Sequence, residues 1–407
     1  MFKKVKIFFL VTLVVSFMFS ISVNANTREA YQISTNPGED MSTMMNIRYH
    51  SDIEDTFVEY TLFEDTTYQN SEIAQGVCTP WSMPVQIEGG FLSSGFAERL
   101  VCDGNLVGLM PDTQYRYRVG KTNMSEDYSF ITAKPRGESG FSFLHITDPQ
   151  YGTEADSHIF NNLISKALEI DPEIRFGFFT GDIVDRGGRE EQWNWFFARS
   201  NIRNLPIAAG VGNHEYYDNS GTPKIQSAEY FNAHFNNPSN GHPTLMNSTY
   251  YFHYNNTLFI MIDTEFQGYA SQVSWFREVM EREAAQFVVV GMHKSFYGGQ
   301  YASQGLGVRN TWRRVFEDYN VDLVLSGHDH IYARSLPMYQ DKPTTNPQLG
   351  ITYIIGGVGG RKFYSVDPSP TSNTQFYDHY VENTSVANII TIDHEKISIE
   401  LIDLYGN

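Results

Sequence analysis

The sequence has few cysteines, a shortage of basic residues and only one long apolar run. Cys78 and Cys102 are the only cysteines among 407 residues, so at most one disulfide can form within the chain. In an exported protein an even pair favours a single bridge, with two buried free thiols as the alternative.

Basic residues are outnumbered, with 29 Lys and Arg against 47 Asp and Glu, which gives a formal net charge of −18. An acidic surface repels polyanions, so nucleic acid is not expected as a bulk partner. A small phosphate ester is still compatible with this charge, because bound metal cations set the local field of a site. The charge also favours solubility.

The long apolar run, residues 7–23, follows Lys3, Lys4 and Lys6 and ends close to Ala25. A basic start, an apolar stretch and small residues at its end predict a signal peptide over residues 1–25. The alternative is an uncleaved anchor, because the run approaches the ~20 residues that span a bilayer. No second apolar stretch of that length follows. We therefore expect a secreted, extracytoplasmic protein without a stable membrane span after cleavage.

The rest of the chain divides into two regions with different patterns. Residues 26–136 contain β-branched and aromatic runs such as 57–63, and alternation of period two at 115–119, which predict an all-β sandwich. A polar stretch rich in Pro and Gly separates it from residues 137–407. There, buried strands alternate with helical patterns, which indicates an α/β layered domain.

Polar side chains follow five of the predicted strands in the second region. They are Asp148 and Gln150, then Asp182 and Asp185, then Asn213 and His214, then His293, and finally His328 and His330. Ligands bind at the carboxyl ends of strands in open α/β sheets, so we expect these groups to converge. Carboxylate, amide and imidazole donors without a thiolate suit Mn, Fe or Zn. Glycines that precede three of these motifs allow close backbone approach.

This ordered set resembles the calcineurin-like metallophosphoesterase superfamily. The Gly212-Asn213-His214-Glu215 form is similar to that of purple acid phosphatases. Residues 109–115 resemble the tyrosine corner of fibronectin type III domains, and such a module precedes the catalytic domain in purple acid phosphatases. The resemblance implies a two-sheet α/β/β/α sandwich over residues 137–407, preceded by a fibronectin III-like domain over residues 26–136.

The resemblance also implies a role for each polar residue in a site with two divalent or trivalent metal ions. Asp148 and His330 are expected to hold the first metal, and Asp182 to bridge both. Asn213, His293 and His328 are expected to complete the second site. His214 is expected to contact the phosphate and protonate the leaving group. Metals in such a pair clamp phosphoryl oxygens, and a metal-bound hydroxide attacks phosphorus.

Three departures from the family pattern limit the transfer of roles. Asp185 stands where purple acid phosphatases carry the tyrosine that binds ferric iron, so we expect no purple absorption band. Gln150 stands where other relatives carry a histidine ligand. Its amide oxygen binds either the first metal or only a water. The paired histidines of plant enzymes are absent between residues 294 and 307. Tyr297, Tyr301 and Arg309 follow the fourth motif instead and are candidates to line the pocket. The candidate substrate contacts are Arg186, Tyr297 and Arg309.

The sequence thus predicts a metallophosphoesterase that hydrolyses small phosphate monoesters. Because the same metal core serves both chemistries, a phosphodiesterase or nucleotide hydrolase is the alternative. A third hypothesis is a non-catalytic binding or adhesion protein, and the complete set of predicted ligands disfavours it.

Overall fold

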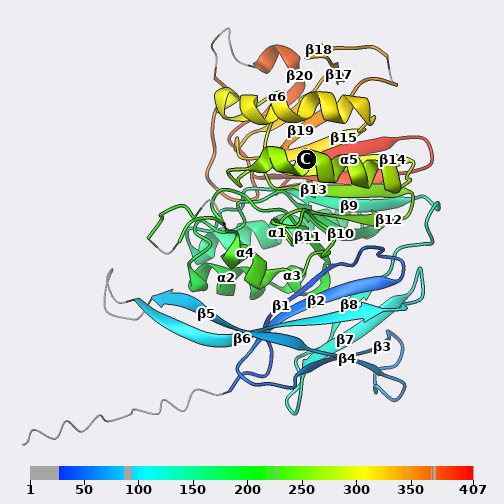
Figure 1. Ribbon diagram of the computed structural model, residues 1–407, viewed down its shortest axis with the longest axis vertical. Helices are drawn as coiled ribbons and strands as arrows, with labels where there is room; N and C mark the ends of the chain where they lie inside the picture. Colours follow the sequence, from blue (N-terminus) through cyan, green and yellow to red (C-terminus); the bar gives the residue numbers. More distant parts are fainter. Residues whose placement is uncertain are drawn as a thin grey trace, which may run out of the picture.

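The computed structural model describes residues 27–86, 94–218, 220–224, 227–346, 348–367, 369 and 373–406. The predicted signal peptide, residues 1–25, lies outside the described residues. None of the described helices combines the length and apolarity needed to cross a bilayer. An N-terminal all-β part and a larger α/β part make up the described chain (Figure 1).

The N-terminal part consists of two antiparallel sheets of four strands. The first has the order β1-β2-β6-β5, with β1 (Tyr31–Pro37), β2 (Met44–Ser51), β5 (Val77–Gln86) and β6 (Ser94–Val107). The second has the order β4-β3-β7-β8, with β3 (Phe57–Leu62), β4 (Glu72–Gln75), β7 (Gln114–Gly120) and β8 (Tyr128–Ile131).

Strand β7 shows why this part folds as a sandwich. Tyr117 and Val119 are buried, whereas Arg116 and Arg118 on the other face are partly exposed. The buried face packs in one apolar cluster with residues of β2 and β3, as the period-two pattern predicts. The hydroxyl of Tyr115 accepts a hydrogen bond from the Met110 amide at 3.0 Å, the backbone contact expected of a tyrosine corner.

Cys78 and Cys102 lie opposite each other on β5 and β6 and form a disulfide. This confirms the favoured pairing over two free thiols.

The α/β part contains two large sheets. The five-stranded sheet has the order β11-β10-β9-β21-β22, with β9 (Phe141–Ile146), β10 (Ile174–Phe179), β11 (Ile207–Ala209), β21 (Val386–Ile392) and β22 (Ile397–Asp403). The seven-stranded sheet has the order β12-β13-β14-β15-β19-β16-β20, with β12 (Tyr250–Tyr254), β13 (Thr257–Ile262), β14 (Phe287–Lys294), β15 (Leu323–Gly327), β16 (Tyr332–Ser335), β19 (Thr352–Gly356) and β20 (Tyr377–Val381). A small hairpin joins β17 (Met338–Tyr339) to β18 (Lys342–Pro343).

Helices cover the outer faces of both sheets. Those packed on the five-stranded sheet are α1 (Glu154–Ile170), α2 (Glu190–Phe197), α3 (Ser200–Asn204) and α4 (Glu229–His234). Those on the seven-stranded sheet are α5 (Gln272–Arg282) and α6 (Ala302–Asp318). Two short 3₁₀ turns, η1 (Tyr269–Ser271) and η2 (Asn373–Phe376), complete the described elements.

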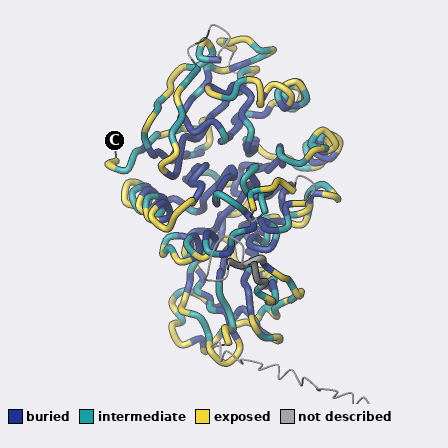
Figure 2. Tube along the Cα trace, turned by 90° about the vertical axis from the view of Figure 1, so that its left-hand side faces the viewer, coloured by how far each residue is buried: buried dark blue, intermediate teal, exposed yellow. Residues whose placement is uncertain are grey.

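Strand β9 is buried on both faces because it lies inside this layered arrangement. Phe141 and Phe143 point into the apolar cluster between the two sheets, and Leu144 and Ile146 point toward the helices. A continuous apolar run is what such a strand requires. The predicted α/β/β/α sandwich is therefore present, with burial concentrated in the sheets (Figure 2).

A buried polar cluster joins the N-terminal part to the α/β part. Arg99 Nη1 on β6 donates to Glu190 Oε1 on α2 at 2.8 Å and to His50 Nδ1 at 3.1 Å. His50 Nε2 donates to the carbonyl oxygen of Ala233 at 2.7 Å. Burial, with the nearby Arg99 cation, lowers the pKa of His50 to about 3, so this ring is neutral.

Candidate metal centre

The predicted ligands converge from both sheets at one edge of the sandwich. The oxygen donors follow β9, β10 and β11 of the five-stranded sheet and are Asp148, Asp182 and Asn213. The imidazoles come from the ends of β14 and β15 of the seven-stranded sheet and are His293, His328 and His330. Within each set the strands run parallel, so their carboxyl ends meet at the same edge. The two sheets therefore supply different donor chemistry.

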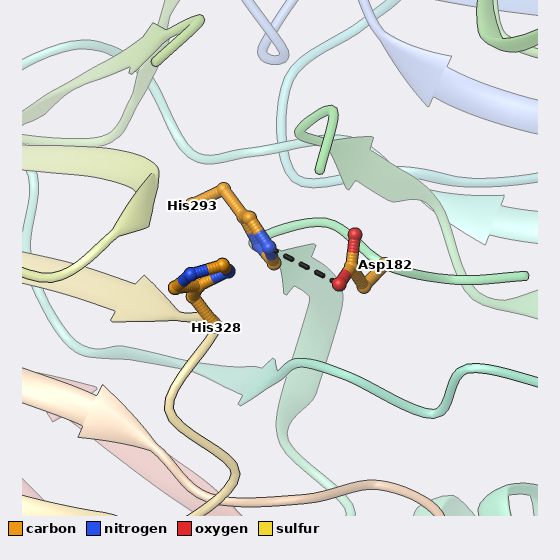
Figure 3. Close-up of side chains that lie close together, drawn as sticks. All are labelled: Asp182, His293 and His328. Carbon is orange, nitrogen blue, oxygen red and sulfur yellow. Dashed lines mark ion pairs between the residues drawn. The ribbon is translucent and has the colours of Figure 1, made fainter. Parts of the chain in front are cut away.

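Two groups of ligand atoms form, and both contain Asp182. One joins Asp182 with His293 and His328 (Figure 3), and the other joins Asp182 with Asp148 and His330. Within each group the ligand atoms lie within 4.8 Å of one another. Asn213 adds a third oxygen donor, because its Oδ1 lies 3.0 Å from His328 Nδ1. A carboxylate shared by two groups has the arrangement required of a bridge.

Two buried atoms indicate that these groups fit metal ions. Asp148 Oδ1 lies 3.3 Å from His330 Nε2, and His293 Nε2 lies 3.2 Å from Asp182 Oδ2. Nevertheless, neither Asp148 Oδ1 nor His293 Nε2 makes a hydrogen bond to a described residue. Buried polar atoms of this kind normally have partners. The lone pairs of these two atoms can coordinate a cation held between the paired side chains.

The electrostatics of the centre also favour a cation. Burial alone lowers the pKa of His293, but the Asp182 and Asp148 carboxylates outweigh it and raise this pKa to about 10. The pKa of Asp182 is lowered although burial opposes the shift, chiefly because His293 and His214 lie close by. The field that attracts a proton to this cluster attracts a metal ion in the same way.

The backbone of the ligand loops is bent in an unusual way. Positive φ angles occur at Asp148 (51°), Asp182 (52°), His328 (73°) and His330 (43°). Non-glycine residues in this region are strained and cluster at functional sites. Gly212 allows the close approach, since a Cβ there would lie 2.2 Å from Asp182 Oδ1. The predicted role of the preceding glycine is thus confirmed at this position.

Glu215 organises the two loops although it faces away from the donor cluster. Its buried carboxylate accepts backbone hydrogen bonds at 2.7–3.1 Å from four amides, which are those of Asp182, Ile183, Val184 and Gly212. These amides belong to the loops after β10 and β11. One side chain therefore fixes the backbone on both sides of the shared Asp182. The sequence pattern included Glu215 without indicating this role.

His214 lies beside the cluster, with its ring oriented by the chain. Its Nδ1 donates to the carbonyl oxygen of Asp185 at 2.6 Å, and its Nε2 lies 3.8 Å from Asp182 Oδ2. The backbone amide of His214 donates to Asp182 Oδ1 at 2.8 Å. The ring is therefore fixed next to the shared carboxylate, at the wall of the adjacent cavity.

Both ends of the Gln150 amide contact other side chains. Its Oε1 accepts a hydrogen bond from Lys362 Nζ at 3.2 Å. Its Nε2 donates to Asp185 Oδ1 at 3.0 Å and lies 2.9 Å from His214 Nε2. Ligation of a metal by Gln150 stays a prediction, because the second lone pair of Oε1 is still available.

A cavity of about 350 Å³ opens directly on the cluster. The predicted residues that line it are Asp182, Asn213, His214, Tyr301, His328 and His330, and those that the sequence did not single out are Tyr217, Glu265, Lys294, Gln304 and Tyr364. Lys294 Nζ donates to Glu265 Oε2 at 2.7 Å, so the wall carries an ion pair. The position of Lys294 directly after His293 was the only available signal for it.

The three candidate substrate contacts are not among the residues that line this cavity. Tyr297 is 2% exposed and donates to Asp341 Oδ1 at 3.2 Å. Arg309 lies 3.6 Å from the same carboxylate and contacts the Tyr297 ring. Arg186 lies 3.8 Å from Asp185 in the loop after β10. Tyr297 packs in the apolar cluster beneath α6, and a contact of these three residues with substrate stays a prediction.

Comparison with known proteins supports this description. Residues 141–332 match the family model of calcineurin-like phosphoesterases. The chain is 27% identical over 242 residues to a phosphoenolpyruvate phosphatase from Allium cepa, covering 55% of this chain and 48% of that protein. It is 25% identical over 265 residues to probable purple acid phosphatase 20 from Arabidopsis thaliana, covering 62% and 58%. The chain thus spans about half the length of these curated relatives.

A solved structure extends the likeness to most of the chain. Purple acid phosphatase PPD1 from yellow lupin (Lupinus luteus) seeds superposes with a TM-score of 0.76 at 18% identity, covering 93% of this chain and 73% of that one. The match includes the N-terminal sheets as well as the α/β part. Residues 141–332 are therefore similar to calcineurin-like phosphoesterases, and the chain has the fold of this purple acid phosphatase.

Proposed function

We propose that this protein is a secreted, metal-dependent phosphatase that hydrolyses small phosphate monoesters. The main support is the convergence of the Asp148 and Asp182 carboxylates with three imidazoles, including two buried donor atoms without hydrogen bonds. The family match and the size of the adjacent cavity agree with a small phosphate ester as substrate. The disulfide agrees with export, because such bonds persist in oxidising compartments.

The side chains divide into two metal sites that share Asp182. Asp148 and His330 would hold the first ion, and Asn213, His293 and His328 would hold the second. Bound ions of this kind supply positive charge to the phosphoryl oxygens and lower the pKa of water. Glu215 keeps the shared carboxylate in place through the backbone, so little reorganisation is needed when substrate binds.

His214 supplies the proton that the leaving group requires. Its Nδ1 is occupied by the Asp185 carbonyl oxygen, so only Nε2 is available toward the cavity. In the neutral ring Nε2 accepts from the Gln150 amide, which lies 2.9 Å away. Protonation turns Nε2 into a donor, and this proton can pass to the departing oxygen. Nε2 lies 3.8 Å from Asp182 Oδ2.

The test measures hydrolysis of phenyl phosphate and of diphenyl phosphate after metal removal and refilling with Mn, Zn or Fe. We expect metal-dependent turnover of the monoester, with two ions bound per chain, and its loss in Asp182→Asn. Faster turnover of the diester would instead establish the phosphodiesterase reading. If neither ester is hydrolysed with any metal, the proposed function is wrong.

Export has its own measurement. We expect the protein recovered outside the cytoplasm to begin after Ala25 when its N-terminus is determined by mass spectrometry. A chain that retains residues 1–25 in the membrane fraction would contradict secretion and support the anchor.

A further inference from the structure

Asp329 lies between two predicted ligands but faces the opposite way. The positive φ angles at His328 and His330 turn both imidazoles toward the metal cluster. The carboxylate of Asp329 is buried, with the residue 1% exposed, and it contacts the chain segment that precedes α6. The loop after β15 therefore presents two ligands on one side and one carboxylate on the other.

That carboxylate binds the segment formed by residues 295–301, which we call the wall segment. Asp329 Oδ1 accepts a hydrogen bond from the Tyr301 amide at 2.7 Å, and Oδ2 accepts one from Ser295 Oγ at 3.0 Å. Gly298 packs against the same carboxylate so closely that a Cβ there would lie 2.0 Å from Oδ2. Asp329 thus holds both ends of the wall segment and touches its middle.

The far side of the wall segment is held as well. Asn373 Nδ2 donates to the carbonyl oxygen of Gly298 at 2.9 Å, and Tyr377 Oη donates to that of Tyr297 at 2.6 Å. The path of the segment is therefore defined from two directions. Asp329 connects it by two hydrogen bonds to the loop that carries the ligands.

The wall segment ends at Tyr301, which lines the cavity beside the metal cluster. The Tyr301 ring centre lies 5.5 Å from that of His328 and 5.3 Å from that of Tyr364. Tyr217 lines the same cavity next to His214, with ring centres 5.0 Å apart. Tyrosine rings thus lie beside both His214 and His328 in the wall of this cavity.

We propose that Asp329 is a positioning residue that sets Tyr301 against the metal ligands, so that the site prefers phosphate esters with an aromatic leaving group. The inference rests on the proposed phosphatase function. An aromatic leaving group gains ring contacts with Tyr301 that an alkyl group cannot make. Because the Asp329 carboxylate faces away from the cluster, its role is to place a cavity wall and not to bind metal.

The experiment compares phenyl phosphate with ethyl phosphate for the wild type, Asp329→Ala, Tyr301→Ala and the double variant. We expect Asp329→Ala to lower kcat/KM for phenyl phosphate about three- to tenfold, mainly through KM, because aromatic contacts have this magnitude. Ethyl phosphate should be affected less than twofold. The double variant should be no worse than Tyr301→Ala, since both changes remove the same contact.

Metal content and a conservative variant distinguish a positioning role of Asp329 from a general disruption of the site. Asp329→Ala should keep two ions per chain, and Asp329→Asn, which retains an acceptor for the Tyr301 amide, should restore most of the preference for phenyl phosphate. Should Asp329→Ala fail to fold, Asp329→Asn and Tyr301→Ala still give the comparison. Equal losses for both esters, loss of metal, or additive effects in the double variant would overturn the proposal.

Binding of phenylphosphonate and methylphosphonate distinguishes this inference from the proposed function, because neither compound requires turnover. Tighter binding of phenylphosphonate to the metal-loaded wild type, with the difference reduced in Asp329→Ala, supports the positioning role even in a protein that hydrolyses no ester. Equal binding of the two phosphonates to the wild type would overturn it.

Discussion

Glu215 holds Asp182 through the main chain, because Glu215 Oε2 accepts a hydrogen bond from the Asp182 amide at 2.9 Å. The same oxygen accepts from the Gly212 amide at 2.8 Å, so one atom joins the loops after β10 and β11. The position of the shared metal ligand is therefore set by a residue that is not in the donor cluster.

Glu215→Gln should impair both stability and metal binding. A glutamine amide turns an NH₂ group toward backbone N–H donors, which leaves buried donors without acceptors at a cost of about 1–3 kcal/mol each. We expect the free energy of unfolding to fall by about 3 kcal/mol in urea titrations. Glu215→Asp, which keeps the charge, should recover part of it. Wild-type stability and metal content in Glu215→Gln would contradict this role.

Gln150→Ala should retain two metal ions per chain, because six other side chains are expected as ligands and both ends of the Gln150 amide contact protein side chains. His330→Ala should lose one ion and reduce turnover by at least about 100-fold, since loss of ligand-supporting residues alone costs 10–100-fold. Elemental analysis after dialysis measures the metal content of both variants. A single ion in Gln150→Ala would show that the amide is a ligand.

The iron-loaded protein should lack the purple absorption band. Asp185 occupies the position of the iron-binding tyrosine, and its carboxylate accepts a hydrogen bond from Gln150 Nε2 at 3.0 Å. We expect no phenolate-to-iron band in the visible spectrum of the wild type. Asp185→Tyr is the informative variant, because appearance of the band would show that this position faces the iron. A band in the wild type would mean that another tyrosine binds the metal.

Stability should decrease in acid because of His50. Burial and the Arg99 cation lower its pKa in the folded protein from the ordinary 6.5 to about 3. The unfolded chain therefore takes up this proton first. The contribution of the neutral His50 ring to the free energy of unfolding is complete above pH 6.5. It is lost as the pH falls from 6.5 toward 3, by about 1.4 kcal/mol per pH unit.

Urea unfolding of the metal-free protein between pH 7.5 and 4.5 measures this dependence. The amide of His50→Gln can donate to the Ala233 carbonyl oxygen but does not titrate. In this variant the free energy of unfolding should fall less steeply with decreasing pH, by the slope that corresponds to about one proton. His394→Gln, at an exposed position, is the matched control and should leave the slope unchanged. Equal slopes for the wild type and His50→Gln would contradict a buried neutral ring.

The order of strands and the donor groups were predictable because each has a local signal. Alternation in residues 115–119 predicted β7, and a polar group after each buried strand predicted the edge where Asp148 and His293 meet. Most of the cavity wall was not predictable. Tyr301 and Gln304 lie in a glycine-containing stretch with little helical signal, yet α6 begins there, at Ala302. Tertiary contacts determine the conformation of that stretch. Tyr301 binds Asp329, which is distant in the sequence, and Gly305 packs against Ser295, which no sequence pattern marks.

Strand order has a consequence for the timing of assembly during synthesis. Strand β9, which leads into Asp148, pairs on one side with β10 and on the other with β21, residues 386–392, which are synthesised long after β9. The strand of the first ligand therefore waits for residues 386–392 before it has both neighbours. Until then one edge of β9 has no partner strand, so a nascent chain exposes unpaired backbone donors and acceptors there.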